Sequence, residues 1–259
     1  MERINFDNSL PLSNLDRALI FVEDYLMLER ASRISTITTY LGLIRTIWTK
    51  YDIHEPTMNN AELLILSLYN KGLSKNTINL YIEAFMCWAA ATGKPIELKR
   101  FRVVPTIPDI LTHEEIAILM EACRTAKSRC IVATMLHLGL RPTECIELRI
   151  GDLRLNEDFI DIKNHGRGPM SSERSVPLTD EYVQFLNQWL EERSQLAFQY
   201  DYRPLQPDDY LFITQNNQPY TIHALNQLLR RITAKTKLSG KVHPYKLRQT
   251  HKIFKEYYS

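Results

Sequence analysis

The last seventeen residues of the chain, HPYKLRQTHKIFKEYYS, carry phenol, guanidinium, imidazole and ammonium groups at a regular spacing. Pro244 suits the first position of a helix, so the sequence predicts a helix that continues into the final KEYYS. At 100° per residue, Tyr245 and His251 each lie about 60° from Arg248 on that helix. One face therefore carries hydrogen-bond donors that suit a phosphate group. A solvent-exposed polar face would have the same composition.

A second arginine, Arg141, stands at a joint between two predicted helices in the segment LHLGLRPTECIEL. The first helix is predicted to end at Gly139, and Pro142 begins the next one. Arg141 can therefore project rigidly from the joint, and Glu144 is close enough to hold it through a charge-assisted hydrogen bond. A purely structural pair of Arg141 and Glu144 would explain the same pattern.

Two further basic residues belong to a predicted β-hairpin. Segments 159–162 and 174–178 have β-like patterns, with a glycine-containing turn between them. Lys163 follows the first strand, and Arg167 stands between two glycines. A basic residue at a hairpin tip can reach a backbone phosphate, although many hairpin tips are charged without such a role.

The elements that must position these residues predict a mainly α-helical fold with a small β-sheet, arranged in two domains. Residues 1–93 contain four helical patterns and are predicted to form a compact helical domain. Residues 94–110 contain three prolines and four basic residues, which predicts an extended linker. Residues 111–259 form the second, α+β domain, which opens with a predicted capping box of Thr112 and Glu115.

Within the second domain, the hydrophobic pattern places the remaining elements in order. Helices are predicted near 112–125, 127–139 and 180–196, and another from 221 to about 235. A short strand is predicted at 210–213. The domain therefore combines helices with a hairpin and one further strand.

Composition restricts the class of protein. The chain has 259 residues, of which 44% are hydrophobic and 24% charged, as in soluble globular proteins. No apolar run is long enough to cross a bilayer, and the first residues show no secretory pattern. The four cysteines lack metal-binding spacing, so buried reduced thiols and a cytoplasmic location are predicted. No metal site and no membrane partner are expected.

Charge is unevenly distributed although the formal net charge is only +2. Residues 1–30 hold three arginines and six acidic residues, whereas residues 230–259 hold nine basic residues and one glutamate. This basic end favours a polyanionic partner, and the basic segment 94–110 favours contact with the same partner. A solvated, lysine-rich helix face is the alternative.

Together these segments resemble the tyrosine recombinases, the family of phage integrases and Xer-type recombinases. STITTYLGLIRTIW and GLSKNTINLYIEAFMCWAAATGKP are similar to the family's helical core-binding domain. HLGLRPTECIELRIGDL is similar to its first arginine box, GRGPMSSERSVPL to its GKGxKxRxVPL hairpin, and HPYKLRQTH to its HxLRHT second box. The resemblance covers essentially the whole chain.

The resemblance implies site-specific DNA recombination or integration without a metal or nucleotide cofactor. In the family, a tyrosine hydroxyl attacks a DNA phosphodiester and forms a 3′-phosphotyrosyl link, inside a tetramer on two DNA sites. By this resemblance Arg141 and Arg248 bind the phosphate, Glu144 supports them, and a hairpin lysine protonates the leaving oxygen. The implied partners are double-stranded DNA and further copies of the chain. The candidate DNA contacts elsewhere are Lys75, Lys94, Lys99, Arg100, Arg102 and Lys241.

Three positions depart from the family's pattern. Arg167 aligns with the family's lysine, but arginine is a poor proton donor because its pKa stays above about 12. Lys163 is the only lysine between positions 127 and 235, so both residues remain candidates. Tyr245 replaces the family's first histidine and can still hydrogen-bond a phosphate oxygen without adding charge. Gln249 stands where the family usually has histidine, and His243 is predicted to cap the helix.

The nucleophile is the remaining question, because the family's tyrosine lies well downstream of the second arginine. On a continuous helix, Tyr257 lies about 13.5 Å from Arg248 along the axis and about 180° round it, and Tyr258 about 15 Å along and about 80° round. Packing is the stronger interpretation of both, unless the helix breaks or the tyrosine serves a neighbouring protomer. The nucleophile is therefore predicted to be missing from this chain. A non-catalytic, sequence-specific DNA-binding protein on the same scaffold is the alternative function.

Overall fold

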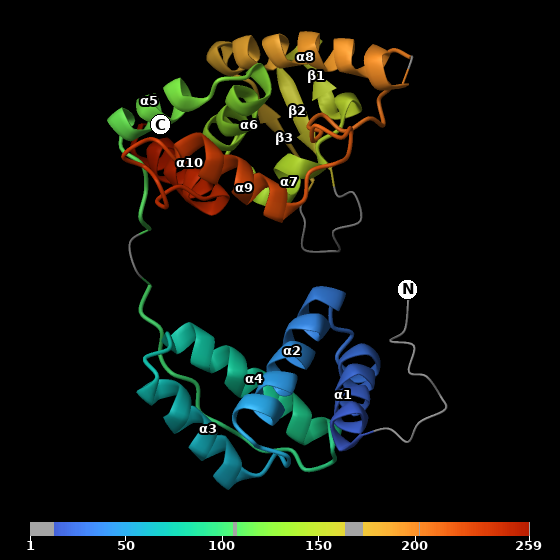
Figure 1. The fold of residues 1–259 in the computed structure, drawn as a ribbon, viewed down its shortest axis with the longest axis vertical. Coiled ribbons are helices and arrows are strands. Elements are labelled where there is room, and N and C mark those ends of the chain that lie inside the picture. Colours follow the sequence, from blue (N-terminus) through green and yellow to red (C-terminus); the bar gives the residue numbers. More distant parts are fainter. Residues whose placement is uncertain (1–12, 106–107, 164–172, 202, 259) are drawn as a thin grey trace. The chain divides into compact units, whose positions relative to one another are not determined.

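The computed structural model describes residues 13–105, 108–163, 173–201 and 203–258 (Figure 1). The chain divides into two compact units, Met1–Thr106 and Ile107–Ser259, and each unit has its own cluster of buried hydrophobic residues. Helices predominate in both units, and the sheet is small. The predicted fold class, mainly α with a small β-sheet, is confirmed.

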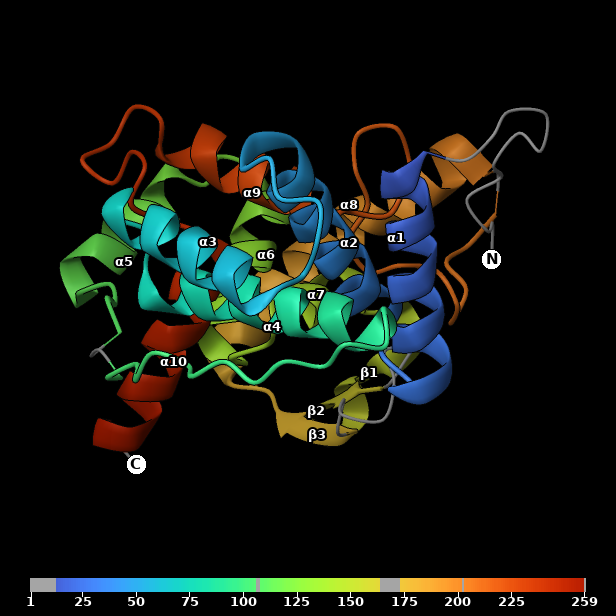
Figure 2. The ribbon, with the colours of Figure 1, turned by 90° about the horizontal axis from the view of Figure 1, so that it is seen from below.

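Four helices form the described part of unit 1. The helices are α1 (Asn14–Asp24), continued by a π-helical turn (Tyr25–Glu29), α2 (Ile34–Lys50), α3 (Met58–Asn70) and α4 (Lys75–Ala91). The side chains of Ser13, Thr57 and Ser74 accept hydrogen bonds from the first turns of α1, α3 and α4, which satisfies free N–H groups there. Helix α4 contacts the other three helices (Figure 2). It buries the side chains of Phe85 and Trp88.

The segment after α4 is extended, but its first part packs on unit 1. Ile96, Leu98 and Phe101 lie against the hydrophobic core. The side-chain amide of Asn79 accepts a hydrogen bond from the N–H of Phe101 at 2.8 Å and donates one to its carbonyl at 2.9 Å. The basic residues of this segment are therefore carried on a chain that is fixed to α4, because its apolar neighbours are buried.

Unit 2 places helices around a three-stranded antiparallel sheet. The helices are α5 (His113–Ala122), α6 (Ala126–His137), α7 (Pro142–Glu147), α8 (Asp180–Asp201), α9 (Ile222–Thr233) and α10 (Pro244–Tyr258). Two short 3₁₀ turns, Ile150–Asp152 and Leu155–Glu157, flank the first strand. The strands β1 (Leu153–Arg154), β2 (Phe159–Ile162) and β3 (Arg174–Pro177) lie in that order, and Ile162 pairs with Arg174. The predicted hairpin is therefore formed by β2 and β3.

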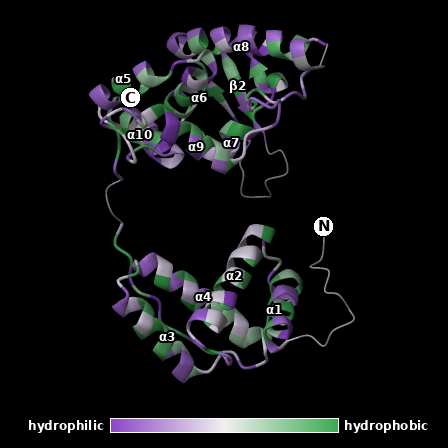
Figure 3. Cartoon of the chain, in the orientation of Figure 1, coloured by the Kyte–Doolittle hydropathy of each residue, from purple (hydrophilic) through white to green (hydrophobic). Residues whose placement is uncertain are grey.

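Helix α6 is the centre of unit 2. It packs against α8 on one side and α10 on the other (Figure 1). Its residues Cys130, Val132 and Met135 are fully buried. Among the described residues, no helix combines the length and the apolar composition that a membrane crossing needs. The longest described helix, α8, carries hydrophilic and hydrophobic residues along its whole length, and buries Tyr182, Leu186 and Trp189 on one side (Figure 3).

Segment 210–213, predicted as a strand, forms only isolated bridges and no regular strand within the described part of unit 2. The N–H of Leu211 donates to the carbonyl of Leu148 at 2.8 Å, and the Leu211 carbonyl accepts from the indole of Trp189 at 2.9 Å. Since a side chain satisfies a carbonyl that a partner strand would otherwise bind, no ladder extends from this segment. The continuous apolar run of this segment reflects the burial of Leu211, Phe212 and Ile213, not a sheet.

Candidate phosphate-binding site

The carboxylate of Glu144, in the first turn of α7, is shared by three arginines. It accepts hydrogen bonds from the N–H of Arg141 at 2.6 Å and from its Nη1 at 2.8 Å. Both terminal nitrogens of Arg174 donate to it at 3.0 Å, and Nη1 of Arg248 lies 3.5 Å away. Three segments that are distant in sequence, namely the joint before α7, strand β3 and helix α10, therefore meet at one side chain.

Glu144 is ionised although only 1% of its side chain is exposed. Burial alone would raise the pKa of Glu144, but hydrogen bonds from Arg174 and from the backbone and side chain of Arg141 outweigh it. The pKa of Glu144 consequently falls to about 2. One negative charge then faces three guanidinium groups, which leaves an excess of positive charge for an anion.

The two arginines of the predicted phosphate clamp differ in exposure. The side chain of Arg248 is 11% exposed and donates from Nη1 to the carbonyl of Gly139 at 2.8 Å. Burial and repulsion from Arg141 lower the pKa of Arg248, yet a guanidinium keeps its charge at physiological pH. The side chain of Arg141 is 49% exposed. Arg248 is thus held firmly within the unit, and Arg141 is available to a ligand.

The joint between α6 and α7 is fixed by a contact with His251. Gly139 has a φ of +58°, and a Cβ at this position would lie 2.2 Å from Cδ2 of His251. Nδ1 of His251 donates to the carbonyl of Leu136 at 2.8 Å. Only glycine fits here, because both its backbone conformation and the adjacent ring exclude a side chain. His251 therefore packs against the joint that carries Arg141.

Lys163 lies at the end of β2 and pairs with a buried carboxylate. Its Nζ is 3.1 Å from Oδ1 of Asp152, whose side chain is 2% exposed. Oδ2 of Asp152 accepts from the N–H of Arg149 at 2.8 Å, which fixes the carboxylate. Lys163 is itself about half exposed. The other hairpin candidate, Arg167, lies in 164–172, outside the described residues.

Helix α10 runs without interruption from Pro244 to Tyr258, as predicted. His243 caps it, because its Nδ1 accepts from the N–H of Lys246 at 3.2 Å. Tyr245 is 55% exposed and precedes Arg248 by one turn. The backbones of Tyr257 and Tyr258 belong to the helix, and their side chains lie outside the described part of the structure. The helix break that would bring either tyrosine toward Arg248 does not occur in α10.

The candidate DNA contacts outside this cluster lie on exposed positions of both units. They are Lys75 at the start of α4, Lys94, Lys99, Arg100 and Arg102 after α4, and Lys241 before α10. Arg100 differs from the others because it donates to the carboxylate of Glu83, which compensates its charge. The other five residues of this set are therefore better placed than Arg100 to bind an anion from outside the chain.

Sequence reasoning missed two residues of this site, Arg174 and Asp152. Arg174 stands in the RSVPL segment that the family resemblance covers, but nothing in its spacing marks it as a partner of Glu144. Asp152 follows Arg141 by eleven residues, and its link to Lys163 depends on the turn between α7 and β2. Arg174 and Asp152 are identified only by their contacts with residues of other elements, and the periodicity of the sequence does not reveal such contacts.

The described residues contain no group of three or more His, Cys, Asp or Glu side chains that could hold a metal ion. All four cysteines are buried free thiols, as predicted. Burial raises the pKa of Cys123 to about 11 and that of Cys130 to about 12. These thiols are therefore protonated and serve as packing groups.

Fold and site together define a mainly helical protein with an arginine cluster suited to a phosphate group. The model of the phage integrase family matches residues 109–253. Tyrosine recombinase XerC of Bacillus subtilis (strain 168) is 24% identical over 250 residues, which cover 89% of this chain and 80% of XerC. Tyrosine recombinase XerA of Pyrococcus furiosus is 28% identical over 175 residues, which cover 66% of this chain and 59% of XerA. The chain belongs to the phage integrase family, the tyrosine recombinases.

Solved structures share the fold. The Tn1549 transposon integrase in complex with a circular intermediate DNA aligns with a TM-score of 0.71 at 17% identity, covering 93% of this chain and 87% of the integrase. A lambda integrase tetramer bound to a Holliday junction aligns with a TM-score of 0.65 at 15% identity, covering 99% of this chain and 76% of that protein.

Proposed function

We propose that this chain acts in site-specific DNA recombination or integration, through the strand-cleavage chemistry of tyrosine recombinases. The observation that carries the proposal is the cluster of Arg141, Arg174 and Arg248 on the buried carboxylate of Glu144. Its excess positive charge suits a phosphodiester and the additional charge of a pentavalent transition state. The named relatives are tyrosine recombinases, which supports the same chemistry.

In this proposal each member of the cluster has a separate task. Arg141 and Arg248 donate to the non-bridging oxygens of the scissile phosphate, and Glu144 with Arg174 fixes their directions. Lys163 or Arg167 protonates the leaving 5′-oxygen, and Tyr245 adds an uncharged hydrogen bond. The nucleophilic tyrosine is neither Tyr257 nor Tyr258, since on α10 Tyr257 lies opposite Arg248 and Tyr258 lies about 15 Å from it along the axis.

A polar stripe on α9 supports duplex DNA as the substrate. His223, Gln227 and Arg230 are exposed and fall within about 60° of one another on the helix. Leu225 and Leu229 are buried on the opposite face. Imidazole, amide and guanidinium groups can hydrogen-bond base edges in a major groove, which admits one helix. We therefore assign α9 to the DNA-reading surface of unit 2.

The proposed partners and location follow from this assignment. Double-stranded DNA with a specific site is the substrate, and copies of the chain assemble on it as a tetramer. The Tn1549 integrase complex with DNA and the lambda integrase tetramer on a Holliday junction support this assembly by their shared fold. A cytoplasmic location on DNA is proposed on the same basis.

Trapping on nicked DNA tests the source of the nucleophile. The chain first selects its site from random duplexes, and nicked duplexes with that site then trap any covalent tyrosine–DNA adduct. We expect no adduct on this chain, because Tyr257 lies on the opposite side of α10 from Arg248 and Tyr258 lies about 15 Å from it along the axis. An adduct that disappears in Tyr257→Phe or Tyr258→Phe would contradict this expectation and identify the nucleophile.

Complementation separates the recombinase from the non-catalytic alternative. A family member that carries its tyrosine is mixed with this chain on the selected site, and strand exchange is measured. Exchange should depend on this chain and fall at least a hundredfold with Arg141→Gln or Arg248→Gln, while DNA binding persists. DNA binding that never supports exchange, in the wild type as in the variants, would favour the DNA-binding protein without catalysis.

A further inference from the structure

We propose that the pocket between α5 and α9 binds a small organic anion with an aliphatic body, such as a medium-chain carboxylate. The pocket lies between the α5–α6 joint and the end of α9 and has a volume of about 580 Å³. Small-molecule sites commonly have volumes of about 300–1,000 Å³. The inference goes beyond the proposed function and does not depend on it, because the ligand is not DNA and Glu144 is not part of the pocket lining.

The pocket lies on the side of α9 that faces away from its polar stripe. Leu228 and Ile232 of the lining lie about 140° and about 180° around the helix from His223. The stripe that begins at His223 is assigned to DNA, so a duplex on that stripe leaves the pocket open to another ligand.

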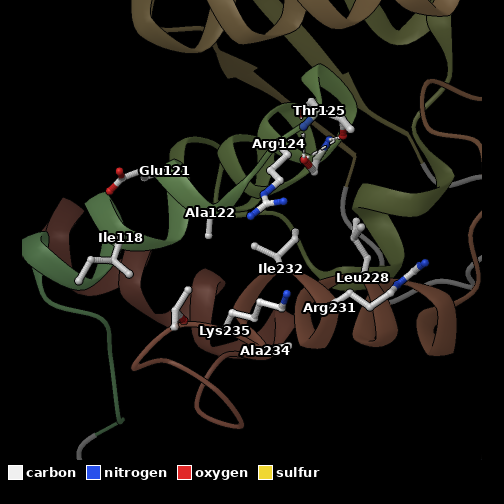
Figure 4. Close-up of a pocket in the computed structure, with 12 residues that line it drawn as sticks. Ile118, Glu121, Ala122, Arg124, Thr125, Leu228, Arg231, Ile232, Ala234 and Lys235 are labelled. Atoms are coloured by element: carbon white, nitrogen blue, oxygen red, sulfur yellow. Dashed lines mark hydrogen bonds between the residues drawn. The ribbon is translucent and has the colours of Figure 1, made fainter.

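The floor of the pocket is aliphatic. Ile118, Leu228 and Ile232 line it and also pack, partly buried, against the core of unit 2. Ala122 and Ala234 add to this apolar surface, which in Figure 4 comes from α5 on one side and from α9 and its end on the other. Each methylene group of a ligand that leaves water for such a surface raises affinity about fourfold. The floor therefore suits an alkyl chain.

Two cations extend over this floor from opposite sides. In Figure 4, the guanidinium of Arg124 and the ammonium group of Lys235 extend toward the same hollow, over Ile232. No hydrogen bond or ion pair joins Arg124 or Lys235 to another described residue. Among the described residues that line the pocket, Glu121 is the one acidic side chain, and in Figure 4 it lies on the outer side of α5. The head group that fits between the two cations is therefore an anion.

The hydroxyl groups of the lining are already engaged within the chain. Thr125 donates to Oγ of Ser128 at 2.9 Å, and Thr236 donates to the carbonyl of Thr233 at 2.9 Å. A neutral polar ligand that used these groups would first have to break those hydrogen bonds. The two cations and the aliphatic floor thus define the class of ligand, which has an anionic head and an apolar body.

Ligand-observed NMR titration tests the proposal on the full chain, with octanoate as the probe. Octanoate should bind at least roughly tenfold more tightly than its uncharged analogue octanamide, because only the carboxylate forms charge-assisted hydrogen bonds with the cations. It should also bind at least roughly tenfold more tightly than butyrate, which has a shorter alkyl chain to place on the floor. Arg124→Gln and Lys235→Gln should each weaken octanoate binding about tenfold and leave octanamide binding unchanged.

The matched control is Lys237→Gln, which removes the same charge as Lys235→Gln from an exposed lysine outside the pocket lining. Its affinity for octanoate should equal that of the wild type. A wild-type chain that binds no octanoate would overturn the pocket. An equal loss in Lys235→Gln and Lys237→Gln would do the same, as would unchanged octanoate binding in Arg124→Gln with native circular dichroism.

Duplex DNA and a membrane surface are the other sources of anionic groups, and two further measurements distinguish them. Displacement of bound octanoate by duplex DNA would assign the cations to DNA and overturn the proposal. The chain is also sedimented with vesicles of phosphatidylcholine and phosphatidylglycerol. We expect no cosedimentation, because Arg124 and Lys235 extend into a hollow and not toward a flat surface. Cosedimentation that Arg124→Gln abolishes would replace the free ligand by a lipid headgroup.

Discussion

At Glu144, one buried carboxylate fixes the directions of three guanidinium groups, so its ionisation is coupled to folding. An isolated arginine would lose rotamer freedom on binding a phosphate, whereas Arg141, Arg174 and Arg248 are already ordered by hydrogen bonds or close contact with the same group. Removal of the carboxylate would leave three positive charges facing one another. Glu144 is therefore a positioning residue whose effect reaches both stability and binding.

The pH dependence of stability should reveal this coupling. The pKa of Glu144 is lowered from 4.5 to about 2 in the folded chain, so its ionisation stabilises the fold above pH 4.5. This contribution, roughly 3 kcal/mol, is lost progressively as the pH falls from about 4.5 to about 2. Glu144→Gln should lower the free energy of unfolding at pH 7 by about 3 kcal/mol and make it less sensitive to acid in that window.

Urea unfolding at pH 7 and pH 3 measures both effects. Glu114→Gln, an exposed glutamate in the first turn of α5, is the control and should change stability by less than about 1 kcal/mol. A Glu144→Gln variant that keeps the acid sensitivity of the wild type would show that other carboxylates dominate acid unfolding.

A substrate whose leaving group needs no proton can show whether Lys163 or Arg167 is the proton donor. Lys163 is fixed by the buried Asp152 and can give up a proton far more readily than a guanidinium. In the complemented reaction, Lys163→Met should slow cleavage about 10²- to 10⁴-fold. A substrate with sulfur at the bridging 5′ position should restore most of this loss, because a thiolate leaves without protonation.

Arg167→Met is the matched comparison for that substrate. It should weaken DNA binding and show no selective rescue by sulfur. Selective rescue of Arg167→Met, with Lys163→Met unaffected, would reverse the assignment.

At the scale of elements, helix α10 fixes the joint between α6 and α7 through two direct contacts. Gly139 accepts from Arg248 through its carbonyl, and His251, one turn later on α10, lies against its Cα. The position of the joint thus depends on a residue more than a hundred positions away. A side chain at Gly139 would push α10 away and displace both clamp arginines.

Gly139→Ala should therefore destabilise the chain by about 3 kcal/mol, from a left-handed φ and a clash with His251. His251→Ala removes the ring, so in the double variant the clash is absent and only the backbone term of about 1–2 kcal/mol remains. A double-mutant cycle in urea measures the difference. Additive effects of the two substitutions would contradict a direct contact between them.

At the scale of the whole molecule, the two units each have a core and carry basic residues at exposed positions. The segment 94–105 adds to unit 1 because Asn79 and the apolar side chains beside Phe101 hold it. We therefore expect DNA binding to draw on both units and to weaken steeply with salt.

The two neighbouring arginines of this segment should differ in their effect on DNA binding. Arg102→Gln removes an exposed guanidinium and should reduce the slope of log Kd against log salt by about 1. Arg100→Gln should reduce it less, because the carboxylate of Glu83 already compensates Arg100. Anisotropy titrations of both variants measure the slopes, and Arg100→Gln/Glu83→Gln controls for the freed carboxylate. Equal slopes for Arg100→Gln and Arg102→Gln would refute the distinction.

Much of the fold was accessible from local sequence signals. The capping box of Thr112 and Glu115 is present, with hydrogen bonds of 3.1 and 3.2 Å. The hairpin of β2 and β3 and the uninterrupted α10 are also present where glycine, proline and periodicity predicted them. These features depend on neighbours within a few residues. The strand predicted at 210–213 does not form, because its apolar run is buried in the core and the Trp189 indole binds the carbonyl of Leu211.

The sequence by itself determined the chemistry that is available: two arginines in separate boxes, one glutamate beside the first, and a single lysine in the hairpin region. Tertiary structure alone decided how these groups are used. It placed Arg174 in hydrogen-bond contact with Glu144, paired Lys163 with Asp152, and packed His251 against Gly139. The physical reason is that burial and charge pairing depend on distances between segments that are far apart in the chain, and local periodicity carries no information about those distances.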